Sequence, residues 1–388
     1  MPDVPATQQA APFSPGRAPR IAILGTRGIP AAHGGFETFA ERLALHLAAR
    51  GWIVSVACQA DTPGPHPAEW RGVRLTHHRP RTGGALGTME TDLRAVLASL
   101  RHNDLVLTLG YNTAIFGLLV RAARVPHLMN MDGIEWRRDK WSKPVKAWFW
   151  LNERAARLTT DHMIADHPAI AAHLARHTPA DRITVIPYGA DPLLSADPAP
   201  LGALGVTPHR YITFIARPEP ENSLLEVVTA FSQRPRGVDL VVLGRLGDSR
   251  YHDAVRAAAS PEVRFVGAIY DTAIVAALRV HAALHIHGHR VGGTNPSLVE
   301  ALGAGNPILA HDNPFNRWVA GPGMAYFSDT QGCAAELDRL LAPRADLAQM
   351  AAAARTRHAE TFTWPAVLEA YEAVLAGWLP GRLKNGGK

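Results

Sequence analysis

The stretch "GTRGIPAAHGGFETFAERLALHL" (residues 25–47) decides the fold, because it joins a strand to a helix through a glycine-bearing loop. The apolar run Ile21–Leu24 precedes it and predicts a buried strand. A helix is expected over Phe36–Arg50, with one apolar face made of Phe36, Phe39, Leu43 and Leu47. A strand, a loop and an amphipathic helix in this order are typical of a doubly wound α/β domain.

The glycines of this loop suggest a ligand. Gly34 and Gly35 stand directly before the helix, where bare backbone N–H groups and the helix N-terminus favour an anion. A simple turn without a ligand is the alternative. The dinucleotide-binding pattern Gly-x-Gly-x-x-Gly is not met, since only Gly25 and Gly28 precede Pro30. The pattern therefore argues against an NAD-dependent oxidoreductase.

Strand and helix patterns alternate along the rest of the chain. Apolar runs such as "WIVSVAC", "DLVLTLG", "HMIADH" and "ITVIPYG" are followed by a second series, "YITFIA", "DLVVLG", "VRFVG", "ALHIHG" and "NPILAH". In the second series we expect helices over Ser223–Phe231, Asp271–Ala282 and Pro296–Gly303. This alternation predicts parallel sheets covered by helices on both faces.

The chain is long enough for two domains, and a stretch rich in Pro and Gly separates the two series. We expect an α/β protein of two Rossmann-like domains, with parallel sheets facing a cleft that binds the ligand. The expected parts are a disordered tail (1–18), a first domain (19–190), a linker (191–209), a second domain (210–361), a helix packing back on the first domain (about 362–379) and a tail (380–388).

Composition narrows the function classes. Apolar residues make up 47% of the 388 residues, but no run of about 18 apolar residues predicts a membrane span. The formal net charge of +6 favours an anionic partner. The N-terminal tail has no apolar segment typical of a signal peptide. Cys58 and Cys333 lack the spacing of a disulfide scaffold or zinc site, which suits a reducing cytosol.

The opening stretch, extended to residue 58, resembles the amino-terminal end of glycosyltransferase family 4, the retaining GT-B enzymes. It is most similar to a branch of bacterial rhamnosyltransferases of polysaccharide synthesis. The resemblance continues through "NMDGIEWRRDKWS", "VIPYGADP", "ARPEPEN", "GGTNPSLVEALGAGNPILAHDNPFNRWV" and "FTWPAVLEAY", and covers nearly all of residues 20–380. It implies a GT-B fold. It also implies that Gly34 and Gly35, which match a Gly-Gly pair of the family, lie beside the donor pyrophosphate and the acceptor.

The second domain carries a candidate donor site in "HGHRVGGTNPSLVEALGAGNPILA" (residues 287–310). The backbone N–H groups of Gly293, Thr294 and Asn295 precede a helix that begins near Pro296, and are expected to point at an anion. Glu300 lies one turn further, where a carboxylate can accept both ribose hydroxyls; a solvent-facing side chain is the alternative.

The family signature has two glutamates eight positions apart. Glu300 matches the second, whereas the first falls on Gly292, so contacts to the transferred sugar must come from elsewhere or from backbone.

A second donor motif is "ARPEPENSLLEVV" (residues 216–228). An arginine can clamp a phosphate through two hydrogen bonds, and Arg217 matches the arginine of the family. The lysine that follows in the family is Asn222 here, so one positive charge is missing from the site of the leaving group. Arg290 or Arg245 are candidates to replace it by position.

Histidines alternate after the strand "ALHIHG". If the strand persists, His285, His287 and His289 share one face, but no Asp, Glu or Cys stands at ligand spacing. We therefore expect neither a metal nor a cofactor, in agreement with the resemblance. His289, nearest the glycines, is a candidate to contact the donor and to take part in catalysis.

The acceptor is expected to contact residues of the first domain. Asp132 stands at a strand end, where a carboxylate can orient or deprotonate a hydroxyl, although Asp before Gly is also a common turn. Glu135 is the weaker alternative. His33, next to Gly34, is a further candidate contact to the acceptor.

The segment 136–150 combines cations with aromatic side chains. Lysines and arginines alternate there with tryptophans and a phenylalanine, which suits an anionic lipid surface, although some of these rings can equally be core residues. We expect a cytoplasmic protein with peripheral contact to the inner face of the plasma membrane. Apart from this segment, Lys and Arg are dispersed, so no nucleic-acid partner is expected.

The resemblance implies a retaining hexosyltransferase that moves a sugar from a nucleotide diphosphate to a lipid-linked saccharide in exopolysaccharide or capsule synthesis. The implied donor is dTDP-rhamnose, with a UDP-sugar or GDP-sugar as alternatives. Two other functions stay open: a sugar-nucleotide epimerase of GT-B fold, and a catalytically inactive GT-B binding protein, given Gly292 and Asn222.

Overall fold

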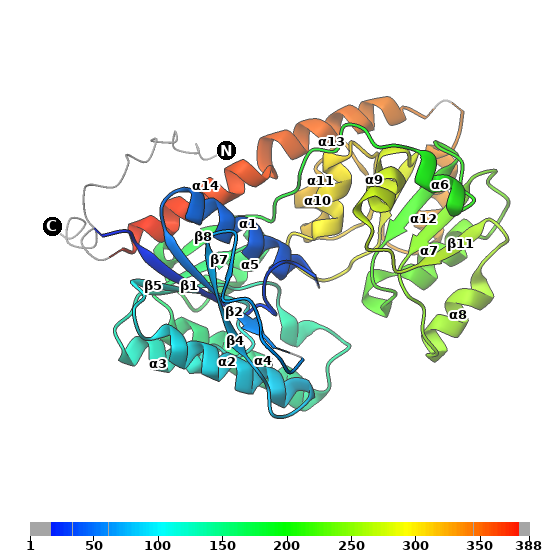
Figure 1. The fold of residues 1–388 in the computed structure, drawn as a ribbon. Coiled ribbons are helices and arrows are strands. Elements are labelled where there is room, and N and C mark those ends of the chain that lie inside the picture. Colours follow the sequence, from blue (N-terminus) through cyan, green and yellow to red (C-terminus); the bar gives the residue numbers. More distant parts are fainter. Residues whose placement is uncertain (1–16, 33, 61, 344, 380–388) are drawn as a thin grey trace. The chain divides into compact units, whose positions relative to one another are not determined.

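The computed structural model describes residues 17–32, 34–60, 62–343 and 345–379, so most of the two expected tails and His33 lie outside the described residues. Strands and helices alternate through two sheets (Figure 1), which confirms the α/β class expected from the sequence.

The first sheet has eight strands in the order β3-β4-β2-β1-β5-β6-β7-β8. The pairs with assigned register are parallel except β3 with β4, an antiparallel hairpin that the sequence patterns did not predict. The strands are β1 (Arg20–Leu24), β2 (Ile53–Gln59), β3 (Glu69–Trp70), β4 (Val73–His78), β5 (Leu105–Leu109), β6 (His127–Asn130), β7 (His162–Ala165) and β8 (Ile183–Val185).

Helices connect these strands. They are α1 (Gly35–Ala49), α2 (Gly84–Ser99), α3 (Gly117–Ala122), α4 (Lys143–Thr159) and α5 (Pro168–Leu174), with short 3-10 turns at η1 (Ala114–Phe116), η2 (Glu135–Arg137) and η3 (Ala180–Arg182).

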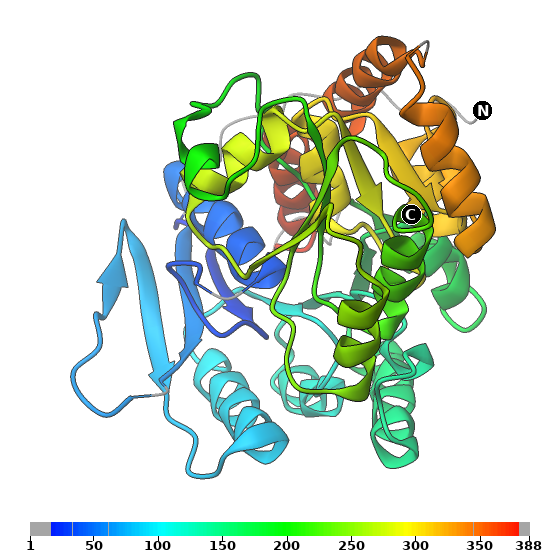
Figure 2. The ribbon, with the colours of Figure 1, turned by 90° about the vertical axis from the view of Figure 1, so that its right-hand side faces the viewer.

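The second sheet has six strands in the order β11-β10-β9-β12-β13-β14, and every adjacent pair is parallel. Figure 2 shows these strands together with the helices that flank them. They are β9 (Tyr211–Ile215), β10 (Asp239–Leu243), β11 (Val263–Gly267), β12 (Leu284–His287), β13 (Ile308–His311) and β14 (Ala325–Phe327).

The helices of the second half are α6 (Ala199–Ala203), η4 (Pro220–Asn222), α7 (Leu224–Phe231), α8 (Arg250–Ala258), α9 (Thr272–Val280), α10 (Pro296–Gly303), α11 (Pro314–Ala320), α12 (Thr330–Leu340), α13 (Leu347–Thr361) and α14 (Trp364–Gly377). The expected helix Pro296–Gly303 has these bounds, and the ends of two other expected helices differ by at most two residues. The stretch expected as a linker contains α6.

Alternation of side chains along the strands builds the second core. In β9, Ile212 and Phe214 pack in one cluster with α7 and α12. Tyr211 and Ile215 pack in another cluster on the opposite face, with α6 and α9. Because successive strand residues point to opposite faces, one fully buried strand serves two layers of helices.

The chain divides into two compact units by its internal contacts. The first is Met1–Met131, Leu151–Ile164 and Leu368–Lys388, and the second is Asp132–Trp150 and Ala165–Val367. The end of α14 thus belongs to the first unit, where the ring of Tyr371 lies 4.6 Å from that of Phe39 of α1. The Tyr371 hydroxyl also accepts a hydrogen bond from Asn130 Nδ2 at 2.7 Å.

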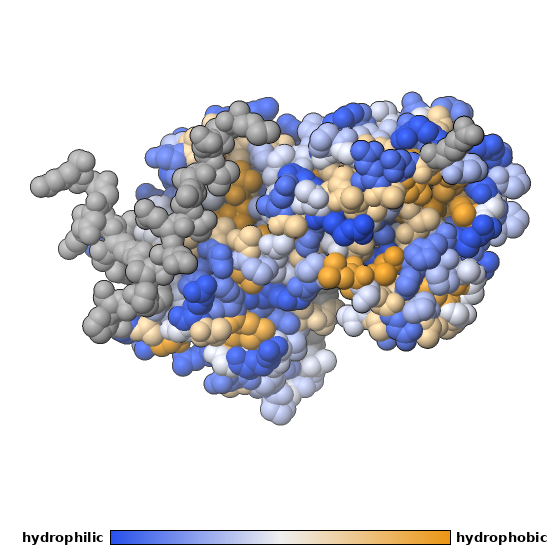
Figure 3. Space-filling view, turned by 90° about the horizontal axis from the view of Figure 1, so that it is seen from above, coloured by the Kyte–Doolittle hydropathy of each residue, from blue (hydrophilic) through white to orange (hydrophobic). Residues whose placement is uncertain are grey.

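No helix among the described residues combines the length and the hydropathy needed to cross a bilayer. On the face seen in Figure 3, hydrophilic and apolar residues are interspersed.

Candidate active site

A glycine loop (residues 288–295) follows β12 and leads into α10, at the carboxyl edge of the second parallel sheet. The helix begins at Pro296 because the Asn295 side chain caps it, accepting the Ser297 N–H at 3.0 Å. Gly292 has φ +131°, a conformation that residues with a side chain rarely adopt. The backbone itself therefore disfavours a glutamate at position 292.

The segment after β9, which carries Arg217, packs against this loop. A Cβ at Gly288 would collide with the backbone oxygen of Asn222. The Arg290 backbone N–H donates to the Glu221 oxygen at 2.9 Å, and the Arg290 guanidinium donates to the Pro220 oxygen at 2.7 Å. The structure thus brings the two predicted donor motifs together in one unit.

Within this pair of segments the predicted residues differ in exposure. The Arg217 side chain is exposed, whereas Asn222 is buried and donates from Nδ2 to the Arg217 backbone oxygen at 2.8 Å. Asn222 therefore shapes the turn behind Arg217. The guanidinium of Arg290 donates a hydrogen bond to the Pro220 oxygen in the same turn. The Arg245 side chain is exposed.

The segment after β6 adds two further cations that the sequence analysis assigned to a membrane surface. Arg138 forms ion pairs with Glu135 at 2.9 Å and with Glu221 at 3.5 Å. The pKa of Lys140 is lowered by partial burial and by the neighbouring charge of Arg138, with a smaller effect of Arg217. Lys140 and Arg138 therefore lie near Arg217, and the charge of Arg138 is compensated by two glutamates.

Asp132 follows β6 with φ +50°, a left-handed conformation that is uncommon for residues other than glycine. The next residue, Gly133, approaches the glycine loop, since its Cβ position lies 3.6 Å from Cα of Gly292. Burial and then the neighbouring charge of Glu135 raise the pKa of Asp132 to about 6. A carboxylate with this pKa is suited to accept a proton near neutral pH.

Asp166 was missed by the sequence analysis. It follows β7 as Asp132 follows β6, so an acidic residue directly after a buried strand was the available signal. Its Oδ2 accepts the backbone N–H of Thr294 at 2.8 Å. The sequence expectation that this N–H points at a free anion is therefore not met here, because an internal carboxylate occupies it.

Glu300 of α10 is held by Arg279, a second residue that the sequence analysis missed. The two side chains form an ion pair at 2.5 Å, in which the Arg279 side chain is 5% exposed and that of Glu300 is 43% exposed. Arg279 also donates to the Ser297 backbone oxygen at 3.1 Å. A buried guanidinium thus fixes the orientation of a carboxylate whose other oxygen is available to a ligand.

The three histidines follow one another in space, although β12 ends at His287 and does not continue to His289, and the rings of His287 and His289 stack with centroids 4.3 Å apart. Burial lowers the pKa of all three; for His289 it falls to about 3, with smaller effects of Arg138 and Arg217. These imidazoles are therefore neutral at pH 7. In the described part of the chain, no three His, Cys, Asp or Glu residues are arranged to hold a metal ion.

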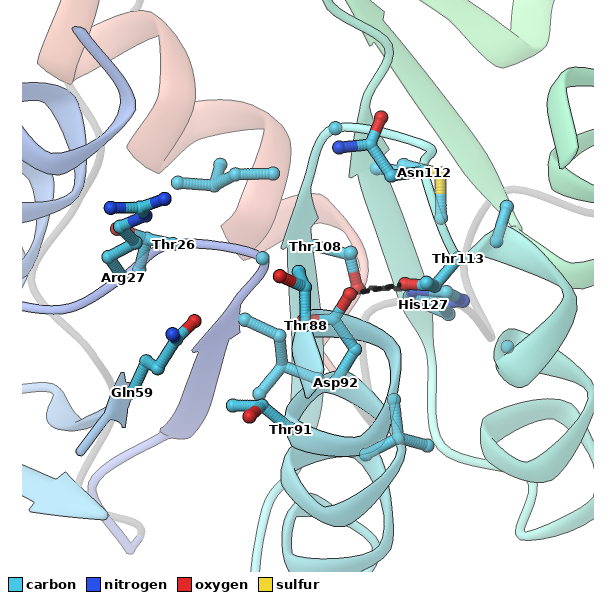
Figure 4. A pocket seen from close by; sticks show the side chains of 18 of the residues that line it. Thr26, Arg27, Gln59, Thr88, Thr91, Asp92, Thr108, Asn112, Thr113 and His127 are labelled. Atoms are coloured by element: carbon cyan, nitrogen blue, oxygen red, sulfur yellow. Dashed lines mark hydrogen bonds between the residues drawn. The ribbon is translucent and has the colours of Figure 1, made fainter. Parts of the chain in front are cut away.

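The first unit has a cavity of about 190 Å³ at the carboxyl ends of β1 and β5, the point where the strand order reverses. Figure 4 shows polar side chains around it, from the loop after β1, from α2 and from the loop after β5. They include Thr26, Gln59, Thr88, Asp92 and Asn112. The cavity thus offers many hydrogen-bonding groups around an apolar floor.

The titratable residues that line this cavity include Arg27, Glu37, Asp92 and His127. Burial raises the pKa of Asp92 to about 6, and Thr113 Oγ1 donates to its Oδ2 at 2.8 Å. His127 donates from Nδ1 to the Thr159 backbone oxygen at 2.9 Å, so its Nε2 accepts from Thr108 Oγ1, also at 2.9 Å. Burial lowers the pKa of this imidazole, which keeps it neutral.

The glycines of the opening motif have different structural roles. At Gly25 a Cβ would collide with the Leu109 backbone, and φ is +82° at Gly25 and +126° at Gly28, so these two positions require glycine. Gly34 precedes α1 and its oxygen accepts the Thr38 N–H at 3.1 Å, while Gly35 is the first helical residue. Gly25 lines the cavity, and the lining residues do not include Gly34 or Gly35.

Comparison with known proteins identifies the class of the fold. Residues 34–189 match the family model described as Glycosyl transferase 4-like domain. No curated protein sequence matches the chain. The sucrose-phosphate synthase of Thermosynechococcus elongatus has a similar structure, with a TM-score of 0.77 and 20% identity over 92% of this chain and 100% of that one.

Two further solved structures are similar. Anabaena HepE, solved in complex with UDP and glucose, has a TM-score of 0.74 and 18% identity over 92% of this chain and 99% of that one. An α,α-trehalose-phosphate synthase (UDP-forming) from Burkholderia vietnamiensis has a TM-score of 0.69 and 13% identity over 93% of this chain and 100% of that one. The expected GT-B glycosyltransferase fold of two Rossmann-like domains is confirmed.

Proposed function

We propose that the protein is a retaining glycosyltransferase that moves a sugar from a nucleoside diphosphate to a hydroxyl acceptor. One observation carries the proposal: the Arg217 segment, the glycine loop and the start of the helix that carries Glu300 lie at the carboxyl edge of one parallel sheet. The match of residues 34–189 to a glycosyl transferase 4-like domain supports it.

The exposed Arg217 clamps the diphosphate that leaves, and its charge stabilises the negative charge that develops as the sugar departs. Lys140 supplies the positive charge that Asn222 lacks, whereas Arg138 is paired with Glu135 and Glu221. The oriented carboxylate of Glu300 accepts the ribose hydroxyls. The N-terminal end of the α10 dipole adds a favourable potential, although the Thr294 N–H is bonded to Asp166 and the Ser297 N–H to Asn295.

On the acceptor side, Asp132 orients the attacking hydroxyl and accepts its proton, with Glu135 next to it. The departing phosphate helps to deprotonate the acceptor hydroxyl from the same face of the sugar. The family resemblance implies this for a retaining enzyme without a covalent protein nucleophile. His289, neutral at pH 7, donates or accepts a hydrogen bond at the donor without adding charge. Gly34, Gly35 and His33 remain proposed contacts.

The donor is proposed to be dTDP-rhamnose on the family resemblance, with UDP-sugars and GDP-sugars as alternatives. HepE was solved with UDP-glucose, which supports a UDP-sugar as an alternative donor. A thermal-shift screen over nucleoside diphosphate sugars tests the donor class, because a ligand at 100 times its Kd stabilises the folded state by about 2.7 kcal/mol. A flat response to all of them would contradict the proposal.

The acceptor is proposed to be a lipid-linked saccharide of exopolysaccharide or capsule synthesis, with a sugar ring in the cavity of the first unit. Hydroxyl and amide side chains around an apolar floor suit a neutral saccharide. We expect Thr88→Val to raise the acceptor KM about tenfold by removing one hydrogen bond in the cavity, and to leave donor hydrolysis unchanged. Thr330→Val, at the start of α12, is a control outside the cavity.

Peripheral contact with a membrane is proposed through the basic aromatic segment 136–150. Part of it is internal, since Trp141 donates to Glu135 at 3.1 Å and its ring contacts that of Phe149 at a tilt, with centroids 5.4 Å apart, whereas Trp150 is 43% exposed. Sedimentation with vesicles containing anionic lipid tests this. Trp150→Ser should lower the bound fraction, and equal binding by both proteins would remove this segment from the membrane contact.

Product analysis separates transfer from the other two functions. A labelled sugar that stays on its nucleotide in changed form indicates an epimerase, and a sugar moved to a saccharide indicates a transferase. Comparison of wild type with Arg217→Ala tests the inactive alternative: we expect at least a hundredfold loss of transfer, because a charge-assisted clamp on the leaving group is removed. Equal rates would remove Arg217 from the mechanism.

A further inference from the structure

The glycine loop encloses the carboxylate of Asp166. Thr294 donates its backbone N–H to Oδ2 at 2.8 Å, and its hydroxyl donates to the Asp166 backbone oxygen. A Cβ at Gly293 would collide with the carboxylate, so only glycine permits this approach. The loop and the end of β7 are thus tied together by two hydrogen bonds and one close backbone contact.

This carboxylate has acceptor capacity that the protein leaves unused. Oδ1 is fully enclosed and has no hydrogen-bond partner among the described residues. An ionised carboxylate can accept about four hydrogen bonds, and an enclosed oxygen without one is costly. Burial and the neighbouring charge of Asp132 raise the pKa of Asp166 to about 7. Such a group calls for a ligand that brings hydroxyl donors.

The loop cannot provide an acidic side chain of its own. Gly292 has φ +131°, and Gly293 is covered by Asp166. The Thr294 hydroxyl is engaged with the Asp166 backbone, and the Asn295 side chain caps α10. Each position from 292 to 295 therefore has a backbone or hydrogen-bonding role that leaves no place for an acidic side chain. The carboxylate that contacts the loop is that of Asp166.

Charge divides the surroundings of the loop. Arg138 and Arg217 lower the pKa of Lys140, whereas the pKa of Asp166 is raised by burial and by Asp132. A diphosphate is repelled by the Asp166 carboxylate and attracted by the arginines. A nucleotide sugar bound here is thereby oriented, with its phosphates toward Arg217 and its sugar hydroxyls toward Asp166.

We propose that Asp166 is a binding residue for the transferred sugar: its carboxylate accepts hydroxyl hydrogen bonds of the donor sugar, in the place of the acidic side chain that the glycine loop lacks at Gly292. This inference rests on the proposed function, since it requires a nucleotide sugar at the loop. It assigns Asp166 to the sugar and leaves the nucleotide to Arg217 and Glu300.

The test compares a bare nucleotide with its sugar conjugate by titration calorimetry, using UDP with UDP-glucose and dTDP with dTDP-rhamnose. We expect Asp166→Asn to bind the bare nucleotide within twofold of wild type, and to bind the sugar conjugate about tenfold more weakly, because charge-assisted hydrogen bonds to the sugar are lost. Asp338→Asn, which removes an exposed carboxylate paired with Arg234 and Arg236, is the matched control.

The outcomes are separable. Equal affinity of Asp166→Asn and wild type for the sugar conjugate overturns the inference, as does equal weakening of both ligands, which would indicate that Asp166 only shapes the loop. Tighter binding by the variant also overturns it, because Asp166 would then compete with the donor. If wild type binds none of the four ligands and no other nucleoside diphosphate sugar in the thermal-shift screen, the proposed function fails as well.

Two further variants keep the test decisive. If Asp166→Asn does not fold, Asp166→Glu keeps the charge but moves it by one methylene group, and the same selective loss for the sugar conjugate is expected. Thr294→Val removes the tether to the Asp166 backbone oxygen and leaves its own N–H in place. A selective loss in Thr294→Val as large as that in Asp166→Asn would contradict the assignment to the carboxylate.

Discussion

At the residue scale, the ion pair between Arg279 and Glu300 links a buried cation to the proposed ribose contact. We expect Arg279→Lys to weaken nucleotide binding about tenfold, because an ammonium cannot hold the carboxylate and the Ser297 oxygen in the same planar geometry. Calorimetric titration with UDP or dTDP measures this. Arg256→Lys, at an exposed pair with Asp253, is the control, and equal losses in both variants would contradict a specific role.

Asp132 makes a prediction about the pH dependence of transfer. Its pKa is raised to about 6 by burial and by Glu135, with Arg138 and Lys140 acting in the opposite direction. A general base must be ionised, so kcat/KM should rise with pH and level off above about 6. Initial rates from pH 4.5 to 8 test this. A profile that is unchanged in Asp132→Asn would assign the base to another group.

The raised pKa of Asp166 also bears on stability. Its pKa in the folded state is about 7, against an ordinary value of 3.8, so the folded state favours the neutral acid. The stabilisation from this group is fully present below pH 3.8 and is lost as the pH rises through about 7. Asp166→Asn should therefore raise Tm relative to wild type more at pH 8 than at pH 5. The same difference at both pH values would contradict the shifted pKa.

At the element scale, α14 is anchored in the first unit through its last two turns. Tyr371 is 1% exposed, packs its ring at a tilt against that of Phe39 and accepts a hydrogen bond from Asn130, and Glu372 pairs with His46 at 2.8 Å. These contacts join the C-terminal part of α14 to α1 and to the end of β6.

We expect Tyr371→Phe to lower the free energy of unfolding by about 1 kcal/mol, the usual contribution of one hydrogen bond, because the ring packing is kept. Tyr371→Ala should lower it by about 3–5 kcal/mol through loss of the buried ring. Urea denaturation monitored by tryptophan fluorescence measures both. Glu369→Ala, on an outward position of the same helix, should change little, and a loss as large as that of Tyr371→Ala would contradict the anchoring role.

At the scale of the whole molecule, the two units carry different binding features. Arg217, the glycine loop and Glu300 belong to the second unit, and the polar cavity belongs to the first. We expect a nucleotide to slow hydrogen exchange in peptides covering residues 288–303, and a saccharide acceptor to slow it in peptides covering residues 84–92 and 110–114. Mass spectrometry of exchanged peptides reads this out. Protection of the cavity peptides by the nucleotide alone would contradict the division of roles.

Local patterns were sufficient for much of the fold. The bounds of α10 follow from Pro296 and the Asn295 cap, and α1 from the spacing of its apolar residues. They failed where the signal was weak, as at the two-residue strand β3 and at the five-residue helix α6. Short elements have too few residues to establish a period, and contacts elsewhere in the chain decide them.

For this protein the sequence by itself determined the alternation of strands and helices, the glycine-bearing turns and the positions of Arg217 and Glu300, because period, capping and backbone freedom are local properties. Only the tertiary structure decided which polar groups meet. These are Asp166 with Thr294, 128 residues apart, Arg279 with Glu300, and Arg138 with Glu221. Such pairs depend on strand order and on the path of loops, and burial then raises the pKa of Asp166. No local pattern of residues contains that information.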